Sequence, residues 1–242
     1  MNVYSRSDIG MVRKSNQDDV NFKLLSDNMA WAVVCDGMGG ANGGDIASKE
    51  AVSCITEVLS EQLNENIPQE SIEKIFESSV KKANSSIYEM SQSKKELSGM
   101  GTTVVLALIY NDFLHIAHVG DSRAYIVNKD GIKQVTLDHS VVQELINNGE
   151  ITHEEAEVHP RKNIITRALG ISSNVDVDYS NIKINKEDRV LLCTDGLTNY
   201  INPETICDVV NKSDLVCVAD ELVDMANNQG GSDNITVALI AQ

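Results

Sequence analysis

The chain has 242 residues, of which 42% are hydrophobic, and its 20 Lys and Arg against 36 Asp and Glu give a formal net charge of −16. This length fits a single globular domain with a sizeable core. The excess of negative charge offers no electrostatic basis for binding nucleic acid or an anionic membrane surface. Two explanations of the acidity stay open, namely general solubility and carboxylates gathered to bind divalent cations.

The five cysteines are widely spaced and form no zinc-binding pattern. Cys35 and Cys193 lie in apolar runs of strand length, where a thiol behaves as a small hydrophobic group. Residues 1–6 lack the apolar core of a signal peptide, and no apolar run approaches the roughly 20 residues needed to span a bilayer. We therefore expect a cytoplasmic protein with reduced thiols.

The first predicted element is an apolar strand over residues 29–35, followed by a glycine-rich loop over 36–44. The loop lacks the Gly-Lys-Ser/Thr ending of a phosphate-binding loop and the spacing of a dinucleotide fingerprint, so we expect no nucleotide there. Apolar residues at helical spacing then predict two helices, within 46–59 and 72–90.

Two β-hairpins are predicted next. Asn111-Asp112 is a turn signal between strands at 102–110 and 113–119, and a second hairpin joins 123–127 to 132–135. Hairpins favour an antiparallel α+β fold over a doubly wound parallel sheet.

Residues 136–169 differ from the rest, since they are polar, lack strand alternation and contain His139, His153 and His159. One helix is expected within 141–148. We interpret this segment as a subdomain that lies over the edge of the sheet.

The remaining chain returns to regular elements. The pattern predicts a strand at 190–194, helices at 203–210 and 215–226, and a closing strand at 234–240. Asp214 is the expected N-cap of the second of these helices.

Three apolar runs end on an aspartate, at Asp36, Asp121 and Asp195, while Asp233 precedes the closing strand and Asp18 follows Asn16-Gln17. Carboxylates gathered at one edge of a sheet repel one another unless a cation neutralises them. Ligands that are all oxygen favour Mg²⁺ or Mn²⁺ over zinc.

Glycines follow two of these aspartates, as Gly37 and Gly196. A glycine permits a tight turn and can bring a carbonyl oxygen close to a metal. Asp-Gly is also one of the commonest turn dipeptides, so an ordinary turn is the alternative at each position.

Seven motifs occur in order along almost the whole chain, at residues 7–18, 34–40, 98–103, 118–123, 165–170, 193–197 and 231–236. Together they resemble the bacterial branch of the metal-dependent protein phosphatases, the protein phosphatase 2C family. The resemblance implies an α+β fold with two stacked antiparallel β-sheets flanked by helix pairs, an α-β-β-α sandwich. It implies one catalytic domain over 1–242, in which 136–169 is a flap that borders the active site and affects substrate choice.

The resemblance also implies a metal site with two Mn²⁺ or Mg²⁺ ions. Asp36 would bridge both ions, the carbonyl of Gly37 would ligate one, and Asp195 with Asp233 would complete the ligands of the other. Asp121 would hold a third ion together with Asp195. Asp18 would bind directly or orient water, and Arg13 would bind the substrate phosphate. Gln17 occupies a position that is Glu in many eukaryotic members, so we expect no direct ligation from its side chain.

These residues imply a serine/threonine protein phosphatase in which a metal-bridging hydroxide attacks the phosphomonoester directly. Arg13 would neutralise charge on the phosphate oxygens because its planar fork matches them. No phosphoenzyme is expected. The sequence contains no Cys-x5-Arg loop, which argues against a cysteine-type phosphatase. The implied partners are phosphoproteins, including an opposing Ser/Thr kinase, and we expect a monomer.

Several alternatives stay open at this point. His139 is either a proton donor to the leaving group or a structural hydrogen-bonder. Arg161 and Arg167 either steer acidic phosphopeptides or are ordinary surface charges, whereas Arg123 is expected to pair with a nearby carboxylate. A non-catalytic binding module is the rival function, although the retained carboxylates disfavour it. The substrate could instead be an anti-sigma-antagonist type of phosphoprotein in a stress or sporulation switch.

Overall fold

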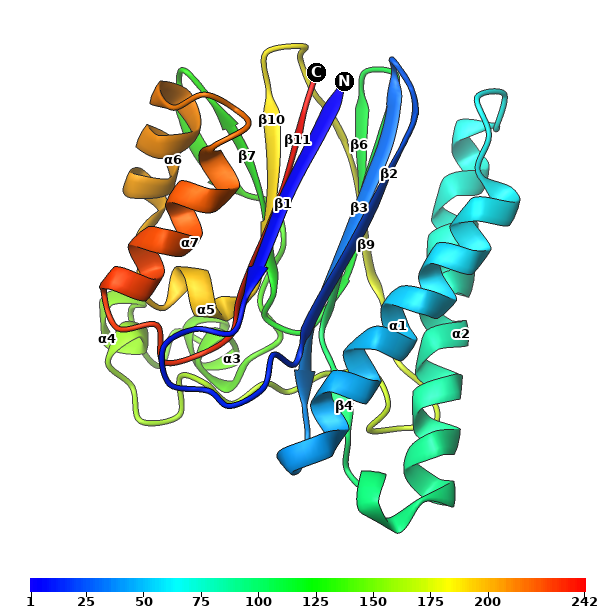
Figure 1. The fold of residues 1–242 in the computed structure, drawn as a ribbon, viewed down its shortest axis with the longest axis vertical. Coiled ribbons are helices and arrows are strands. Elements are labelled where there is room, and N and C mark those ends of the chain that lie inside the picture. The colour runs from blue at the N-terminus through cyan, green and yellow to red at the C-terminus, as the bar shows by residue number, and fades with distance from the viewer.

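The structure is a computed structural model that describes the backbone of all 242 residues and every side chain except those of residues 40–42. Two antiparallel sheets stack face to face, and a helix pair covers the outer face of each (Figure 1). This is the α-β-β-α sandwich that the sequence motifs imply, so the expected fold class is confirmed.

One sheet has the strand order β1-β11-β10-β7-β8, and the other has the order β2-β3-β5-β6-β9, with β4 paired to the end of β3. The strands of the first sheet are β1 (Asn2–Asp8), β11 (Ile235–Ala241), β10 (Arg189–Cys193), β7 (Arg123–Asn128) and β8 (Gly131–Gln134). Those of the second are β2 (Asp18–Ser26), β3 (Met29–Met38), β5 (Val104–Tyr110), β6 (Phe113–Val119), β9 (Asp178–Lys183) and β4 (Gly101–Thr102).

The apolar run at 29–35 is continuous because β3 is buried on both faces. Trp31 and Val33 point toward the helices, whereas Ala30, Ala32 and Val34 point toward the other sheet. The small alanines let the two sheets approach closely. Residues at the strand ends of the two sheets can therefore lie near one another.

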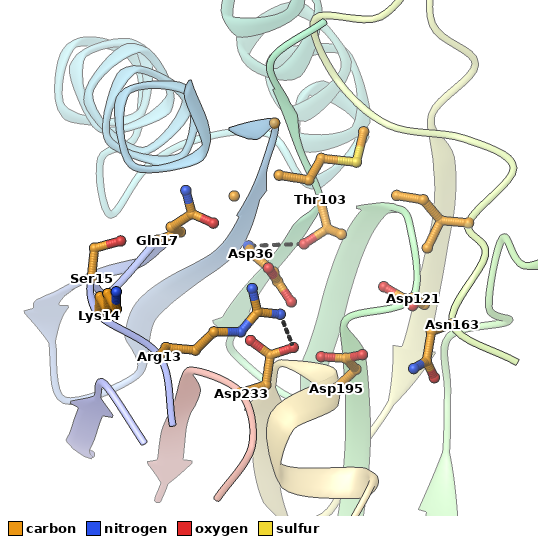
Figure 2. A pocket seen from close by; sticks show the side chains of 14 residues that line it. Arg13, Lys14, Ser15, Gln17, Asp36, Thr103, Asp121, Asn163, Asp195 and Asp233 are labelled. Carbon is orange, nitrogen blue, oxygen red and sulfur yellow. Dashed lines mark hydrogen bonds and ion pairs between the residues drawn. The ribbon is translucent and has the colours of Figure 1, made fainter. Parts of the chain in front are cut away.

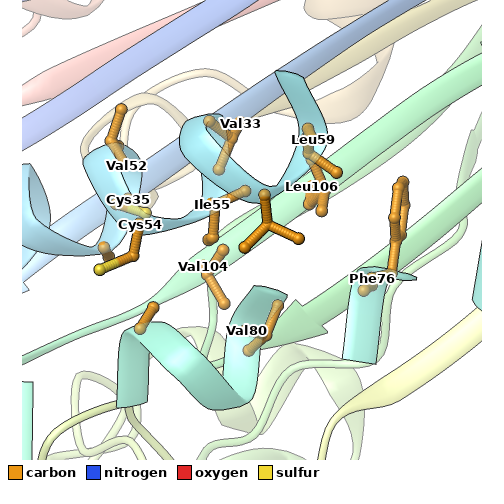
Figure 3. Packing of buried hydrophobic residues seen from close by; sticks show 14 of the residues in the cluster. Val33, Cys35, Val52, Cys54, Ile55, Leu59, Phe76, Val80, Val104 and Leu106 are labelled. Carbon is orange, nitrogen blue, oxygen red and sulfur yellow. The ribbon is translucent and has the colours of Figure 1, made fainter. Parts of the chain in front are cut away.

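Two long helices, α1 (Gly40–Gln62) and α2 (Ile72–Ser93), cover the outer face of the second sheet. Ile55 and Leu59 of α1 and Phe76 and Val80 of α2 pack with Val33 in one buried cluster (Figure 3). Burial of each such side chain is worth about 1.5–3 kcal/mol. Both helices predicted from apolar spacing are therefore present.

The first sheet is covered by α6 (Pro203–Lys212) and α7 (Val218–Asn228). The predicted start of the second helix was wrong by three residues. The helix begins at Val218 with Cys217 as its N-cap, and Asp214 instead accepts the Cys217 N–H on its carbonyl oxygen at 2.8 Å. Asp214 therefore stabilises a turn before the helix.

The segment between β8 and β9 carries α3 (Val141–Asn147), which was predicted, and α4 (His153–Glu157), which was not. A capping box formed by Thr152 and Glu155 begins α4. The other short helices are α5 (Asp195–Thr198), η1 (Gln69–Ser71) and η2 (Lys95–Leu97). Among the described residues, no helix combines the length and apolar character that a membrane span requires.

Candidate active site

A cavity of about 530 Å³ opens at the end of the sandwich where β3 ends and α5 begins. Asp36, Asp121, Asp195 and Asp233 line it, and their side chains converge beside Arg13 (Figure 2). The other lining residues are Lys14, Ser15, Gln17, Gly37, Met38, Gly39, Thr103, Asn163 and Ile165. Four carboxylates that are distant in sequence therefore share one pocket.

Both sheets supply these carboxylates. Asp36 lies on β3 and Asp121 follows β6, in one sheet, while Asp195 follows β10 and Asp233 precedes β11, in the other. Asp36 is not at a strand end as expected, because β3 continues to Met38 by pairing with β4. The site consequently depends on the two sheets being packed together.

Asp18 does not line the cavity but lies behind it. It begins β2 and is the cross-strand partner of Asp36 in the β2–β3 register. Like charges directly opposite each other destabilise a sheet. Asp18 is also only 5% exposed, so solvent does little to relieve this repulsion.

The backbone of Asp36 is held by two threonines of the 98–103 motif, to which the sequence analysis assigned no role. Its N–H donates to Thr103 Oγ1 at 2.9 Å, and its carbonyl oxygen accepts from Thr102 Oγ1 and from the Thr103 N–H, both at 2.8 Å. Thr103 Oγ1 also lies 2.7 Å from Ser122 Oγ. Because Ser122 adjoins Asp121, this hydroxyl pair links two of the carboxylate-bearing segments.

The pKa values of Asp36, Asp121 and Asp195 are raised because the carboxyl groups are crowded together and shielded from solvent. Burial, reinforced by the charges of Asp18 and Asp195, raises the pKa of Asp36 well above its usual range. Burial likewise raises the pKa of Asp121 to about 7. It also raises the pKa of Asp195, helped by the charge of Asp233. Proximity and low exposure thus favour neutral carboxyls where no cation compensates them.

The residues present fit a divalent metal. Asp195 Oδ1 and Asp18 Oδ1 are buried side-chain oxygens without a hydrogen-bond partner. The converging side-chain donors are all carboxylates, which suits Mg²⁺ or Mn²⁺. A cation among them would satisfy the orphaned oxygens and offset the repulsion.

Neither Gly37 nor Gly196 lies in a loop turn, because Gly37 is in β3 and Gly196 is in α5. Both glycines instead allow close packing of the backbone. A Cβ on Gly37 would lie 2.0 Å from the carbonyl oxygen of Gly44, and one on Gly196 would lie 1.9 Å from that of Asn234. The ordinary-turn interpretation of the two Asp-Gly dipeptides was therefore wrong.

Arg13 lies at the mouth of the pocket, where its Nη2 donates to Asp233 Oδ2 at 2.7 Å. Its side chain is 48% exposed and that of Asp233 is 30% exposed. Lys14 is exposed beside it. Arg13 therefore brings a guanidinium to the carboxylate cluster from the solvent side.

Asn234, a residue given no role from the sequence, holds the loop that carries Arg13. Its Nδ2 donates to the carbonyl oxygens of Ile9 at 2.9 Å and Ser15 at 3.0 Å, and its Oδ1 accepts the Gln17 N–H at 2.8 Å. Its place within the last motif was the one available signal. A buried amide with three backbone partners fixes loop geometry far better than surface contacts do.

His139 lies outside the pocket lining and is buried. Its ring Nδ1 accepts a hydrogen bond from the Gly120 N–H at 3.0 Å, and its backbone N–H donates to the Gly120 carbonyl oxygen at 2.9 Å. Its Nε2 lies 3.4 Å from Asp178 Oδ2. These contacts favour the structural role over that of a proton donor, because they tie the segment after β8 to the turn that carries Asp121.

Among the described residues searched, His118, His139 and Asp178 form a further group of potential metal ligands, whose ligand atoms all lie within 4.8 Å of one another. The hydrogen bonds argue against such a site. An Nδ1 that accepts an N–H has no proton, so neutral His139 carries its proton on Nε2, which faces Asp178. His118 Nε2 contacts the Leu137 carbonyl oxygen at 2.9 Å and its ring stacks on His139. The cluster is a hydrogen-bonded support.

The arginines beyond Arg13 are largely paired. Arg123 donates to Asp138 through Nε and Nη2, the latter at 2.6 Å, which confirms the expected carboxylate partner. Arg167 Nη1 lies 2.6 Å from Asp178 Oδ1. Arg161 is exposed.

Comparison with known proteins agrees with this architecture. The family model described as protein phosphatase 2C matches residues 12–239. The chain is 40% identical over 242 residues to serine/threonine phosphatase stp of Listeria monocytogenes, covering 99% of this chain and 95% of that protein. It is 37% identical over 243 residues to protein phosphatase PhpP of Streptococcus pneumoniae, covering 100% and 97%.

Solved structures agree as well. Serine/threonine phosphatase Stp1 from Staphylococcus aureus matches with a TM-score of 0.92 at 36% identity, over 99% of this chain and 94% of that one. The catalytic domain of the serine/threonine phosphatase PstP, solved in complex with two manganese ions, matches with a TM-score of 0.84 at 32% identity, over 98% and 96%.

The fold and the acidic pocket together define a metal-dependent phosphatase of the two-sheet sandwich class. The chain belongs to the protein phosphatase 2C family, and it is thus a protein phosphatase, an enzyme whose substrates are phosphoproteins.

Proposed function

We propose that the chain hydrolyses phosphoserine and phosphothreonine on other proteins with two Mn²⁺ or Mg²⁺ ions, and with a third ion at Asp121. The observation that carries this proposal is the convergence of four carboxylates and one guanidinium on a single open cavity. The names of the relatives from Listeria and Staphylococcus support the choice of substrate.

Each residue has a proposed role in holding the ions. Asp36, the Gly37 carbonyl oxygen, Asp195 and Asp233 would hold two of the ions, and Asp121 together with Asp195 would hold the third. When bound, the ions supply an activated water as the nucleophile and neutralise phosphate charge.

Arg13 binds the phosphate. Its guanidinium offers a planar fork that matches two phosphate oxygens. Because the side chain is half exposed, it can exchange Asp233 for a phosphate without disturbing the buried core. The location at the mouth lets it engage a phosphorylated side chain that enters from solvent.

The surroundings of the site fit a protein substrate. Asn163 and Ile165 line the cavity from residues 136–169, which we assign as the flap of a single catalytic domain over 1–242. The cavity is open enough for a side chain presented by another protein. We further propose that the enzyme is a cytoplasmic monomer that opposes a Ser/Thr kinase.

The test is phosphate release from phosphoserine and phosphothreonine peptides with Mn²⁺, Mg²⁺ or chelator. Activity should require a divalent ion and should disappear in Asp36→Asn, while Asp27→Asn, on an exposed turn, should behave as wild type. A folded wild-type protein that neither binds Mn²⁺ by calorimetry nor releases phosphate would instead be the non-catalytic binding module.

A further inference from the structure

The two oxygens of the Asp18 carboxylate have different surroundings. Oδ2 accepts a hydrogen bond from Thr236 Oγ1 at 2.7 Å and another from Thr194 Oγ1 at 3.0 Å. Oδ1 is equally buried but has no partner. The carboxylate is thus anchored through one oxygen and leaves the other available.

The hydrogen bonds around Oδ2 have a defined direction. Asn16 Nδ2 donates to Ser7 Oγ at 2.8 Å, and Ser7 Oγ lies 2.7 Å from Thr236 Oγ1. Since Thr236 gives its single hydroxyl proton to Asp18, Ser7 must donate to Thr236. The Asp18 N–H donates in turn to Asn16 Oδ1 at 3.1 Å, which closes the ring.

Thr194 belongs to the same network. Its Oγ1 accepts the Thr236 N–H at 3.0 Å, so its own proton is directed to Asp18. Ser7 on β1 and Thr236 on β11 belong to one sheet, and Thr194 directly follows β10 of the same sheet, whereas Asp18 begins β2 in the other sheet. The network therefore spans the packing between the sheets just behind the acidic pocket.

The free oxygen has the acidic cluster as its environment. Asp18 is the cross-strand partner of Asp36, and the charges of Asp195 and Asp233 both act on it. No donor among the described residues satisfies Oδ1. Hydroxyl donors on Oδ2 thus select which oxygen is presented toward the cluster.

We propose that Thr194 and Thr236 are positioning residues of the metal centre, holding Asp18 so that Oδ1 faces the Asp36–Asp195–Asp233 cluster as an acceptor for a cation or its water. This inference rests on the proposed function. It assigns a purpose to two threonines inside motifs whose aspartates alone were given roles. It also explains why a fully buried carboxylate keeps an unsatisfied oxygen.

The decisive measurement is Mn²⁺ binding by calorimetry to Thr236→Val and Thr194→Val, which preserve side-chain shape but remove the hydroxyl. Each should bind Mn²⁺ about 10–100-fold more weakly than wild type, the range for loss of a partner that orients a ligand. Thr236→Ser keeps the hydroxyl and should recover most of the affinity. The control is Thr56→Val, which removes a hydroxyl on α1 that accepts a hydrogen bond from Asn21 Nδ2 on β2. It should leave Mn²⁺ binding unchanged.

A second readout separates positioning from simple destabilisation. With saturating Mn²⁺, Thr236→Val should lower kcat while the KM for a phosphopeptide stays at the wild-type value, because Arg13 is untouched. If the valine variants melt earlier without metal yet bind Mn²⁺ as wild type does, the threonines are merely structural and the inference is wrong. If wild type itself binds no Mn²⁺ and has no activity, the proposed function fails first.

Discussion

Arg13 is the one guanidinium in the pocket lining of the described residues, and it pairs with Asp233 at 2.7 Å. This pairing keeps the guanidinium over the carboxylate cluster, where we propose that it binds the substrate phosphate. An exposed ion pair of this kind contributes little to stability. Under the proposed function, the value of this pair lies in holding the guanidinium in place for a substrate.

We predict that Arg13→Ala lowers kcat/KM for a phosphothreonine peptide by roughly 10²–10³, as loss of a donor to developing charge does elsewhere. Arg13→Lys should recover part of this loss, since it restores charge without the fork. Melting temperature should be nearly unchanged in both variants. Steady-state kinetics on the two variants test this, and wild-type kcat/KM in Arg13→Ala would contradict the phosphate-binding role.

His139 gives a second prediction at this scale. In His139→Asn the amide oxygen can replace Nδ1 as acceptor for the Gly120 N–H, so the structural role should survive. Activity should then be retained equally on a phosphoserine peptide and on p-nitrophenyl phosphate, whose leaving group needs no proton donor. Selective loss of activity on the peptide would identify His139 as the acid instead.

At the level of elements, apolar periodicity predicted what is buried and missed what is half exposed. The two long helices and the buried strands were found because their apolar residues recur on a defined face. β1, β2 and β9 were missed because all three are edge strands with largely polar, partly exposed sequences. Edge strands face solvent on several sides, so their composition resembles that of loops.

The site was predictable in its acids but not in its supports. Strand patterns and the family resemblance pointed to Asp36, Asp121, Asp195 and Asp233, which the structure brings together. Thr103, Thr194, Thr236 and Asn234 were not assigned roles because their partners come from other strands or from distant loops. Such contacts depend on how the two sheets stack, which no local pattern encodes.

The start of α5 yields a prediction about packing. A Cβ on Gly196 would lie 1.9 Å from the Asn234 carbonyl oxygen, so Gly196→Ala should destabilise by about 2 kcal/mol or more and weaken activity through the displaced Arg13 loop. Gly149→Ala is the control, because a Cβ there meets open space and only a left-handed backbone opposes it, at about 1 kcal/mol. Urea unfolding of both variants measures the difference, and equal destabilisation would contradict the packing argument.

At the scale of the whole molecule, the buried acids dominate the response to pH. Burial raises the pKa of Asp18 and of Asp121 to about 7, and it raises those of Asp36 and Asp195. The folded metal-free protein therefore binds more protons than the unfolded chain between about pH 4 and 7, and its stability falls as pH rises through this range.

Buried histidines act in the opposite direction. Burial lowers the pKa of His115 to about 4 and also lowers those of His118 and His139. The folded protein then binds fewer protons than the unfolded chain below about pH 6.5, so this contribution to stability is lost as pH falls. We expect the four acids to set the net direction, because they outnumber the three histidines and act up to about pH 7.

We therefore predict that the metal-free protein melts at a higher temperature near about pH 5.5 than near about pH 7.5. Saturating Mn²⁺ should make the melting temperature higher near about pH 7.5 than near about pH 5.5, because a cation stabilises the ionised acids and only the effect of the buried histidines remains. Addition of a chelator should restore the original order of the two melting temperatures. Calorimetry at both pH values tests this. His115→Gln should weaken the pH dependence of the Mn²⁺-loaded protein, and an order unaffected by Mn²⁺ would contradict the assignment of these acids to a metal site.

The two chain ends lie side by side, because β1 and β11 are paired antiparallel with Asn2 opposite Ala241. Both ends emerge at the edge of the sandwich remote from the acidic cavity (Figure 1). An affinity tag, a fluorophore or a fused protein attached at either end would therefore leave the catalytic mouth unobstructed. Immobilisation through these ends should orient every molecule with its cavity facing the bulk solution.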